Sequence, residues 1–319
     1  MKSTTQKLWK RLHREYVTNP GLFSLRVTVL LLAIALLAAK RSIWTPDTLL
    51  IIVLVVGVVF GRARDFVVRF VPFLGLLIAY DSFRSIADDL NGTVHYMEMI
   101  HFDRWLGFGQ LPTVWLQSVL WHGSVQWYDF YFYFLYTIHF LAPVTFAFIL
   151  WRYRPKFYWP FVWSFVALSF AGFITYVLFP AAPPWLAKEL GYIAEPLHRI
   201  SSDIWWAMGV TNYSEIYANL SPNEVAAVPS LHSAYPLLGS MFMIAAFGWR
   251  KAWWLLIYPL SMWVGVTYLG EHYVVDILVA ILYVVLAYVA VQRFFVWYRH
   301  PKRRLARAVN RLLTRLHLA

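Results

Sequence analysis

The 319-residue sequence contains no cysteine, and only 14% of its residues are charged. The absence of cysteine excludes disulfide bonds, cysteine-ligated metal sites and thiol nucleophiles. A soluble domain has about 25% charged and about 45–50% apolar residues, whereas this sequence is 60% hydrophobic and 19% aromatic. The composition therefore argues against a soluble enzyme, a disordered tail and a fibrous repeat.

Long apolar segments are the main feature of the sequence. A helix needs about 20 mostly apolar residues to cross a bilayer. Eight segments are candidates, and the second and third are short enough to form a re-entrant pair instead. They are residues 23–40, 47–61, 66–82, 128–151, 157–179, 231–249, 252–269 and 273–297. We predict an all-α fold, a polytopic integral membrane helix bundle with six to eight transmembrane helices.

The net charge of +12 suits either nucleic acid or a membrane, so the positions of the basic residues matter. With both termini on one side, 20 of the 28 Lys and Arg residues fall on that side, and most acidic residues fall on the other. The positive-inside rule then predicts cytoplasmic termini and extracytoplasmic loops at 83–127 and 180–230. The pair Lys40–Arg41 does not fit this scheme. We expect membrane lipids as partners and no nucleic acid.

The chain is predicted to form a single membrane domain, residues 23–297, between two basic cytoplasmic tails. The first apolar run lacks a small-residue cleavage site, so we expect a signal anchor. The tail 298–319 alternates leucines with arginines, which suits an amphipathic helix on anionic inner-leaflet lipids. A solvated basic tail that only enforces topology explains residues 298–319 equally well, and residues 1–22 form the other basic cytoplasmic tail. The sequence does not indicate an oligomeric state.

Two proline-containing clusters lie at predicted span ends on the extracytoplasmic side. The segment Phe179-Pro-Ala-Ala-Pro-Pro-Trp185, with Pro183 and Pro184, ends the fifth span, because prolines stop a helix. Taken alone, it is typical of a helix stop with an interfacial tryptophan. The segment Val228-Pro229-Ser230-Leu231-His232-Ser233 opens the sixth span. First-turn N–H groups there can bind an anion beside His232, although a lone histidine at a helix start is more often a capping residue.

Two further clusters contain ionisable side chains at the same face. His272 and Asp276 open the last span four residues apart, so they share one helical face. Asp276 in an apolar span is costly unless paired, and pairing would fix the tautomer of His272 and leave its other nitrogen as a nucleophile or base. Arg84 ends the third span and could clamp a phosphate. The alternatives are a structural His–Asp pair and a surface ion pair of Arg84 with Asp81.

The motifs Pro229-Ser-Leu-His232 and His272-Tyr-x-x-Asp276 resemble the last two signature motifs of the type 2 phosphatidic acid phosphatase superfamily of membrane enzymes. The segment 179–185 followed by these motifs is similar to the branch that contains fungal inositol phosphorylceramide synthase, the aureobasidin-resistance branch. The string His272-Tyr-Val-Val-Asp-Ile277 is also similar to sphingomyelin synthases. The resemblance covers about residues 80–290.

The resemblance implies phosphoryl transfer without a metal or other cofactor. His272 would attack the phosphorus and form a phosphohistidine, and Asp276 would orient its ring. His232 would act as general acid and then as general base. Ser230 could donate to phosphate oxygens. The segment with Pro183, Pro184 and Trp185 would form a supporting loop.

The sequence departs from the phosphatases of this superfamily in its basic residues. They carry a Lys and an Arg in their first motif and an Arg six residues before the nucleophilic histidine. Here Thr175 lies near the lysine position and position 266 is Val. Arg84 is the substitute candidate for phosphate binding, with Lys188 and Arg199 behind it. The lack of these basic residues favours a phosphodiester substrate, which carries less negative charge than a phosphate monoester. We therefore expect transfer of a phospho-headgroup between lipids.

Three alternatives remain open at this point. The same site would suit a lipid phosphate phosphatase, since water and an alcohol compete for one phosphohistidine. A transporter is disfavoured because the polar residues cluster at one face. A metal-dependent hydrolase would need Glu271 beside His232, His272 and Asp276, but adjacent helical positions point apart. His139 is expected only to hydrogen-bond across helices, and loop 98–120 suits an interfacial helix over the site.

Overall fold

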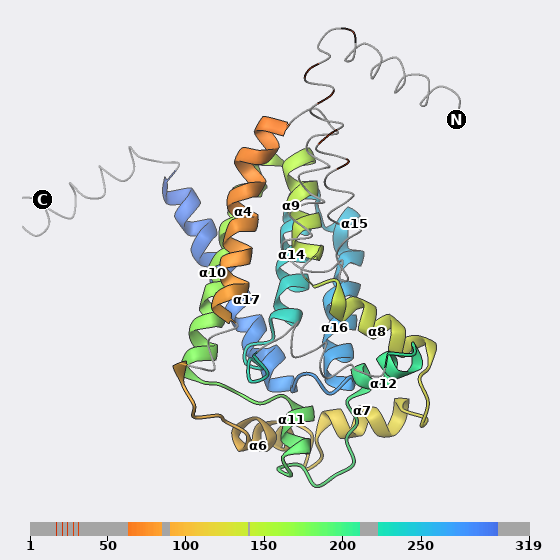
Figure 1. Ribbon diagram of the computed structural model, residues 1–319. Coiled ribbons are helices and arrows are strands. Elements are labelled where there is room, and N and C mark those ends of the chain that lie inside the picture. Colours follow the sequence, from red (N-terminus) through yellow and green to blue (C-terminus); the bar gives the residue numbers. More distant parts are fainter. Residues whose placement is uncertain are drawn as a thin grey trace, which may run out of the picture. The chain divides into compact units, whose positions relative to one another are not determined.

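Figure 1 shows the computed structural model of the chain. It describes residues 63–84, 90–139, 141–210 and 223–298, and the isolated positions 17, 21, 24, 28 and 31. The chain divides into two compact units, residues 1–81 and 82–319. Nearly all of the predicted span 23–40, the predicted span 47–61, most of the N-terminal tail and nearly all of the C-terminal tail lie outside the described residues. The predicted single membrane domain stays a prediction.

The first unit contains most of α4 (Ala63–Arg84), which corresponds to the predicted span 66–82. Its apolar stretch, Val68–Tyr80, is shorter than a membrane crossing needs. Phe70, Phe73 and Leu74 on this helix are fully buried. Pro72 lies inside the helix, where it removes one main-chain hydrogen bond.

A helix bundle forms the main part of the second unit (Figure 1). Its central helix, α14, packs against four others. Gly239 of α14 allows close contact with α9, because a Cβ atom there would lie 2.2 Å from the ring of Phe146. The bundle comprises α9 (Leu141–Tyr153), α10 (Pro155–Leu178), α14 (Leu231–Phe247), α16 (Ile257–Tyr268) and α17 (Val274–Tyr298).

The predicted all-α membrane bundle is confirmed: the described residues contain helices and isolated bridges but no strand. By length and composition, α10 and α17 can each cross a membrane. The predicted span 128–151 is not one straight helix, because α8 (Trp127–Thr137) and α9 form a pair bent by 62°, which is either a broken span or a re-entrant loop. Pro143 explains the break, since proline cannot donate to the carbonyl four residues earlier and its ring clashes with that group.

The span predicted at 252–269 also differs from a single long α-helix. It begins with α15 (Trp249–Ala252) and the 3₁₀ helix η1 (Trp253–Leu256), so that α16 has only 12 residues. The described residues therefore hold two helices suited to cross a membrane, or three if the bent pair is one broken span. The predicted total of six to eight spans stays a prediction.

Short helices from the two predicted external loops lie across one end of the bundle, at the bottom of Figure 1. A buried apolar cluster that includes Ile100, Ile193 and Tyr273 joins three of them to the start of α17, and the fourth packs through Ile200 and Ile204 in a second buried cluster. This layer therefore surrounds the helix starts that carry the histidine motifs. It comprises α6 (Met97–Leu106), α7 (Pro112–Leu120), α11 (Pro184–Glu189) and α12 (Ile200–Ala207).

Candidate active site

The start of α14 is fixed by Ser230, which is its N-cap residue. The Ser230 hydroxyl accepts a hydrogen bond from the Ser233 N–H (3.3 Å), as N-cap residues do. The Ser230 main-chain N–H donates to the carbonyl oxygen of Asp276 (3.2 Å). Tyr176 of α10 donates its hydroxyl proton to the carbonyl of Pro229 (2.8 Å). The first turns of α14 and α17 are thus joined directly, and α10 supports the joint.

A tight turn after α16 sets the position of His272. The N–H groups of Glu271 and His272 both donate to the carbonyl of Val266, at 3.0 and 3.1 Å. Gly270 makes the turn with a φ of 81°, which favours glycine because other residues are strained there. The main-chain N–H of Trp185 donates to the Gly270 carbonyl (3.1 Å), so the proline-rich segment 179–185 supports this turn.

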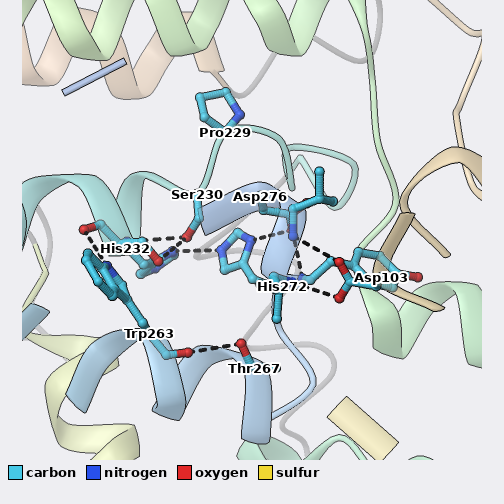
Figure 2. Close-up of polar contacts among 12 residues, drawn as sticks. Asp103, Pro229, Ser230, His232, Trp263, Thr267, His272 and Asp276 are labelled. Atoms are coloured by element: carbon cyan, nitrogen blue, oxygen red, sulfur yellow. Dashed lines mark hydrogen bonds and ion pairs between the residues drawn. The ribbon is translucent and has the colours of Figure 1, made fainter. Parts of the chain in front are cut away.

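His272 lies between Asp276 and His232 (Figure 2). Its Nδ1 is 3.1 Å from Oδ2 of Asp276, and its Nε2 is 3.3 Å from Nδ1 of His232. Asp276 is fully buried and His272 is 5% exposed. Because the ionised carboxylate only accepts, the Nδ1 of His272 must donate to it, which leaves the Nε2 lone pair directed toward His232. The structure thus brings the three predicted catalytic residues together.

His232 is also enclosed by two rings at the break between α8 and α9. The ring of Tyr136 stacks on it with centroids 4.1 Å apart, and the His139 ring lies 4.0 Å away. Nδ1 of His139 lies 3.1 Å from the Tyr136 carbonyl oxygen. The expectation that His139 only links helices is therefore corrected, since it contacts a predicted catalytic residue. No motif in the sequence connects these positions, because only the bend brings them beside α14.

The structure adds an acidic residue that the sequence analysis did not single out. Asp103 of α6 is fully buried, and its two carboxylate oxygens accept the N–H groups of Val274 (2.8 Å) and Val275 (2.9 Å). These are the first residues of α17. Burial raises the pKa of Asp103 to about 6, and the charge of Asp276 acts in the same direction, although the two N–H groups lower the pKa.

Two of the predicted phosphate-binding residues, Lys188 and Ser230, already have hydrogen-bond partners within the protein. The Lys188 ammonium donates to the carbonyls of Ile193 and Ala194, and the Ser230 hydroxyl is buried in its cap. These contacts compete with phosphate binding, which stays a prediction for both residues. The side chain of Arg84 lies outside the described part of the chain. Pro183 and Pro184 begin α11.

The positions that carry basic residues in the phosphatases are filled by neutral contacts. Thr175 hydrogen-bonds the hydroxyl of Tyr283 (2.8 Å), and Val266 is fully buried. Arg199, the other predicted substitute for these basic residues, has two contacts. Its guanidinium carbon lies 3.6 Å from the ring centroid of Trp185, and its Nε pairs with Glu271 (3.2 Å).

Glu271 faces this arginine and the hydroxyl of Ser201. The metal-hydrolase alternative needs the same carboxylate beside the two histidines. No three His, Asp or Glu side chains in the described ranges are grouped so that they could hold a metal ion.

Comparison with known proteins places the chain in a family. The family model described as the PAP2 superfamily matches residues 97–290, which is more than half of the chain. The chain belongs to the PAP2 superfamily, and its apolar helices make it an integral membrane member. The predicted resemblance is confirmed.

Particular relatives are similar to the chain over part of their length. A phosphoinositol dihydroceramide synthase of Bacteroides thetaiotaomicron is 31% identical over 152 residues, which are 44% of this chain and 48% of the relative. The inositol phosphorylceramide synthase catalytic subunit of Schizosaccharomyces pombe is 28% identical over 49% of this chain and 38% of its own. An inositol phosphorylceramide synthase of Candida albicans is 30% identical over 44% of this chain and 31% of its own. The matches thus span half or less of these relatives. No solved structure matches the chain.

Proposed function

We propose that the protein is a metal-independent lipid phosphotransferase that moves a phospho-headgroup, such as phosphoinositol, from one lipid to another. One observation carries this proposal: Nε2 of His272, with Asp276 on the other nitrogen, points at His232 in a chain of the PAP2 superfamily. The names of the relatives, which are synthases of phosphoinositol-containing ceramides, support the choice of headgroup.

In the first step, Nε2 of His272 attacks the phosphorus of the donor lipid and forms a P–N bond. The bond from phosphorus to the donor's lipid oxygen breaks, and a protonated His232 gives that oxygen its proton. The phosphorus must enter between the two rings, so the 3.3 Å contact of His232 with His272 has to open. Asp276 accepts a hydrogen bond from the Nδ1–H of His272 throughout, without taking the proton, and stabilises the positive charge on the imidazole of His272.

In the second step, His232 removes the proton of an acceptor alcohol as its oxygen attacks the phosphorus. The P–N bond breaks and His272 is restored, so that one phosphodiester is exchanged for another. Such a substrate carries one negative charge at phosphorus, which matches the neutral contacts at Thr175 and Val266. The positive end of α14, which begins beside His232, can interact with this charge without a basic side chain.

We also propose that this site faces the extracytoplasmic side and that both termini are cytoplasmic. Support comes from the distribution of the basic residues and from the short helices of loops 83–127 and 180–230, which lie at the end of the bundle that carries the site. In this arrangement the catalytic domain covers residues 23–297, and the basic tails face the anionic inner leaflet.

The test is a headgroup-transfer assay in detergent or liposomes with EDTA present. Labelled phosphatidylinositol and other phospholipids are offered with and without ceramide or diacylglycerol. Formation of a new phospholipid that depends on the acceptor supports the proposal and identifies both substrates. Release of inorganic phosphate from a lipid phosphate without an acceptor would instead identify a phosphatase with the same residues. Loss of activity with EDTA would contradict the metal-independent mechanism.

A further inference from the structure

We propose that Asp103 is a positioning residue for catalysis: it holds the first turn of α17 so that Asp276 stays bound to His272. This inference rests on the proposed roles of His272 and Asp276. Asp103 lies 171 residues before Val274, in a helix that carries none of the predicted catalytic residues.

The contact is well placed for this role. Three consecutive N–H groups open α17, and two carboxylates satisfy all of them. Asp276 accepts a hydrogen bond from the main-chain N–H of Tyr273 (2.9 Å), just before the helix, and Asp103 accepts those from the next two N–H groups. Buried N–H groups without an acceptor cost about 1–3 kcal/mol each, so the start of α17 depends on both acids.

Without Asp103, two buried main-chain N–H groups would compete with His272 for the carboxylate of Asp276. The N–H groups of Val274 and Val275 would lack an acceptor, and Asp276 is the acidic group of the same turn. Its Oδ1 is buried and has no hydrogen-bond partner among the described residues, so rotation toward these donors would satisfy them. The same rotation would move Oδ2 away from Nδ1 of His272 and release the imidazole from its orientation.

The position of α6 does not depend on this contact alone. Met99 and Ile100 of α6 are buried in the apolar cluster that contains Tyr273. Arg104 pairs with both carboxylate oxygens of Glu195, at 2.7 and 2.9 Å. Because the apolar contacts of Met99 and Ile100 hold the helix, Asp103 can transmit a fixed position to α17, whereas the partly exposed ion pair of Arg104 contributes little to this position. Arg104 also offers a matched control, since it is the next residue of the same helix and its side chain is 37% exposed.

The experiment compares Asp103→Asn, Asp103→Ser and Arg104→Gln with the wild-type chain in the transfer assay. The asparagine keeps the size of the side chain, but its amide nitrogen would face one of the two main-chain N–H groups. We expect both Asp103 variants to lower kcat about tenfold, corresponding to about 1.4 kcal/mol, with KM changed less than twofold. Arg104→Gln should keep kcat and KM. Wild-type kcat in both Asp103 variants, or an equal loss in Arg104→Gln, would overturn the inference.

Amide hydrogen exchange measured on the full chain in detergent gives a second readout that needs no activity. Exchange in a peptide covering residues 273–276 should be about tenfold faster in both Asp103 variants, since one hydrogen bond is lost, and unchanged in Arg104→Gln. If the wild-type protein hydrolyses lipid phosphates and does not transfer headgroups, the same kcat comparison on hydrolysis still tests the positioning role. Unchanged exchange in both Asp103 variants would contradict it whatever the reaction.

Discussion

Replacement of Asp276 by asparagine tests the proposed mechanism most directly. Oδ2 of Asp276 accepts from both Nδ1 of His272 (3.1 Å) and the N–H of Tyr273 (2.9 Å). If the amide oxygen takes this place, both hydrogen bonds survive but the negative charge is lost. The attraction between two unit charges at 4 Å is about 4 kcal/mol at an effective dielectric constant of about 20, which corresponds to about 10³ in rate.

If the amide nitrogen takes that place instead, it faces two donors. His272 must then accept at Nδ1 and carry its proton on Nε2, which removes the lone pair that attacks phosphorus. The equivalent substitution in a serine protease lowers kcat about 10⁴-fold for this reason. We therefore expect Asp276→Asn to lower kcat between about 10³-fold and about 10⁴-fold.

The assay is acceptor-dependent headgroup transfer by purified protein at saturating donor lipid. Asp203→Asn is the matched control, because it makes the same chemical change on α12 in a half-buried side chain, and it should keep kcat within about twofold. Size-exclusion chromatography and thermal melting show whether the Asp276 variant is folded. A folded Asp276→Asn protein with kcat within tenfold of wild type would refute the assigned role.

Three further predictions concern other parts of the molecule. His139→Phe keeps a ring against His232 but loses the hydrogen bond of His139, so kcat should fall about 2- to 10-fold and the acid side of the pH–rate profile should change; an unaltered profile would leave His139 with packing alone. Gly239→Ala should lower the free energy of unfolding by about 1–3 kcal/mol, because its methyl group meets the Phe146 ring, and an unchanged melting temperature would contradict this close contact. Burial raises the pKa of Asp103 from its ordinary value of 3.8 to about 6, so the folded state holds this proton more tightly than the unfolded chain. The resulting stabilisation is complete below about pH 4 and is lost as pH rises through about 6, and thermal melts should show a pH dependence that Asp103→Asn lacks.

Local patterns predicted the site where the relevant spacing was short. His272 and Asp276 are four residues apart, and a helical period alone places them on one face. Pro229 and Ser230 indicated the start of α14 because such residues begin helices. The bias of the basic residues placed both motifs on the same side of the membrane, and the structure brings them into contact.

Contacts that depend on the tertiary fold could not be predicted in the same way. The segment 128–151 is mostly apolar, so its hydropathy predicts one span. Pro143 is the one sign of a break, and it does not indicate that the bend places Tyr136 and His139 beside His232. Asp103 belongs to a short helix of mixed apolar and polar residues. Nothing in its neighbourhood indicates that it contacts Val274, because that contact depends on how the loop 83–127 folds back over the bundle.

The contact of Asp103 with Val274 also has a consequence for biosynthesis. The carboxylate of α6 reaches its hydrogen-bond partners only after 171 further residues have been made. His232 likewise meets His272 only when the start of α17 is present. A nascent chain that has inserted its earlier helices therefore has no assembled catalytic centre. With the roles proposed for His232 and His272, the order of synthesis itself would delay activity until the last described helix has joined the bundle, and a stalled or truncated chain ending before α17 would be inert toward the lipids around it.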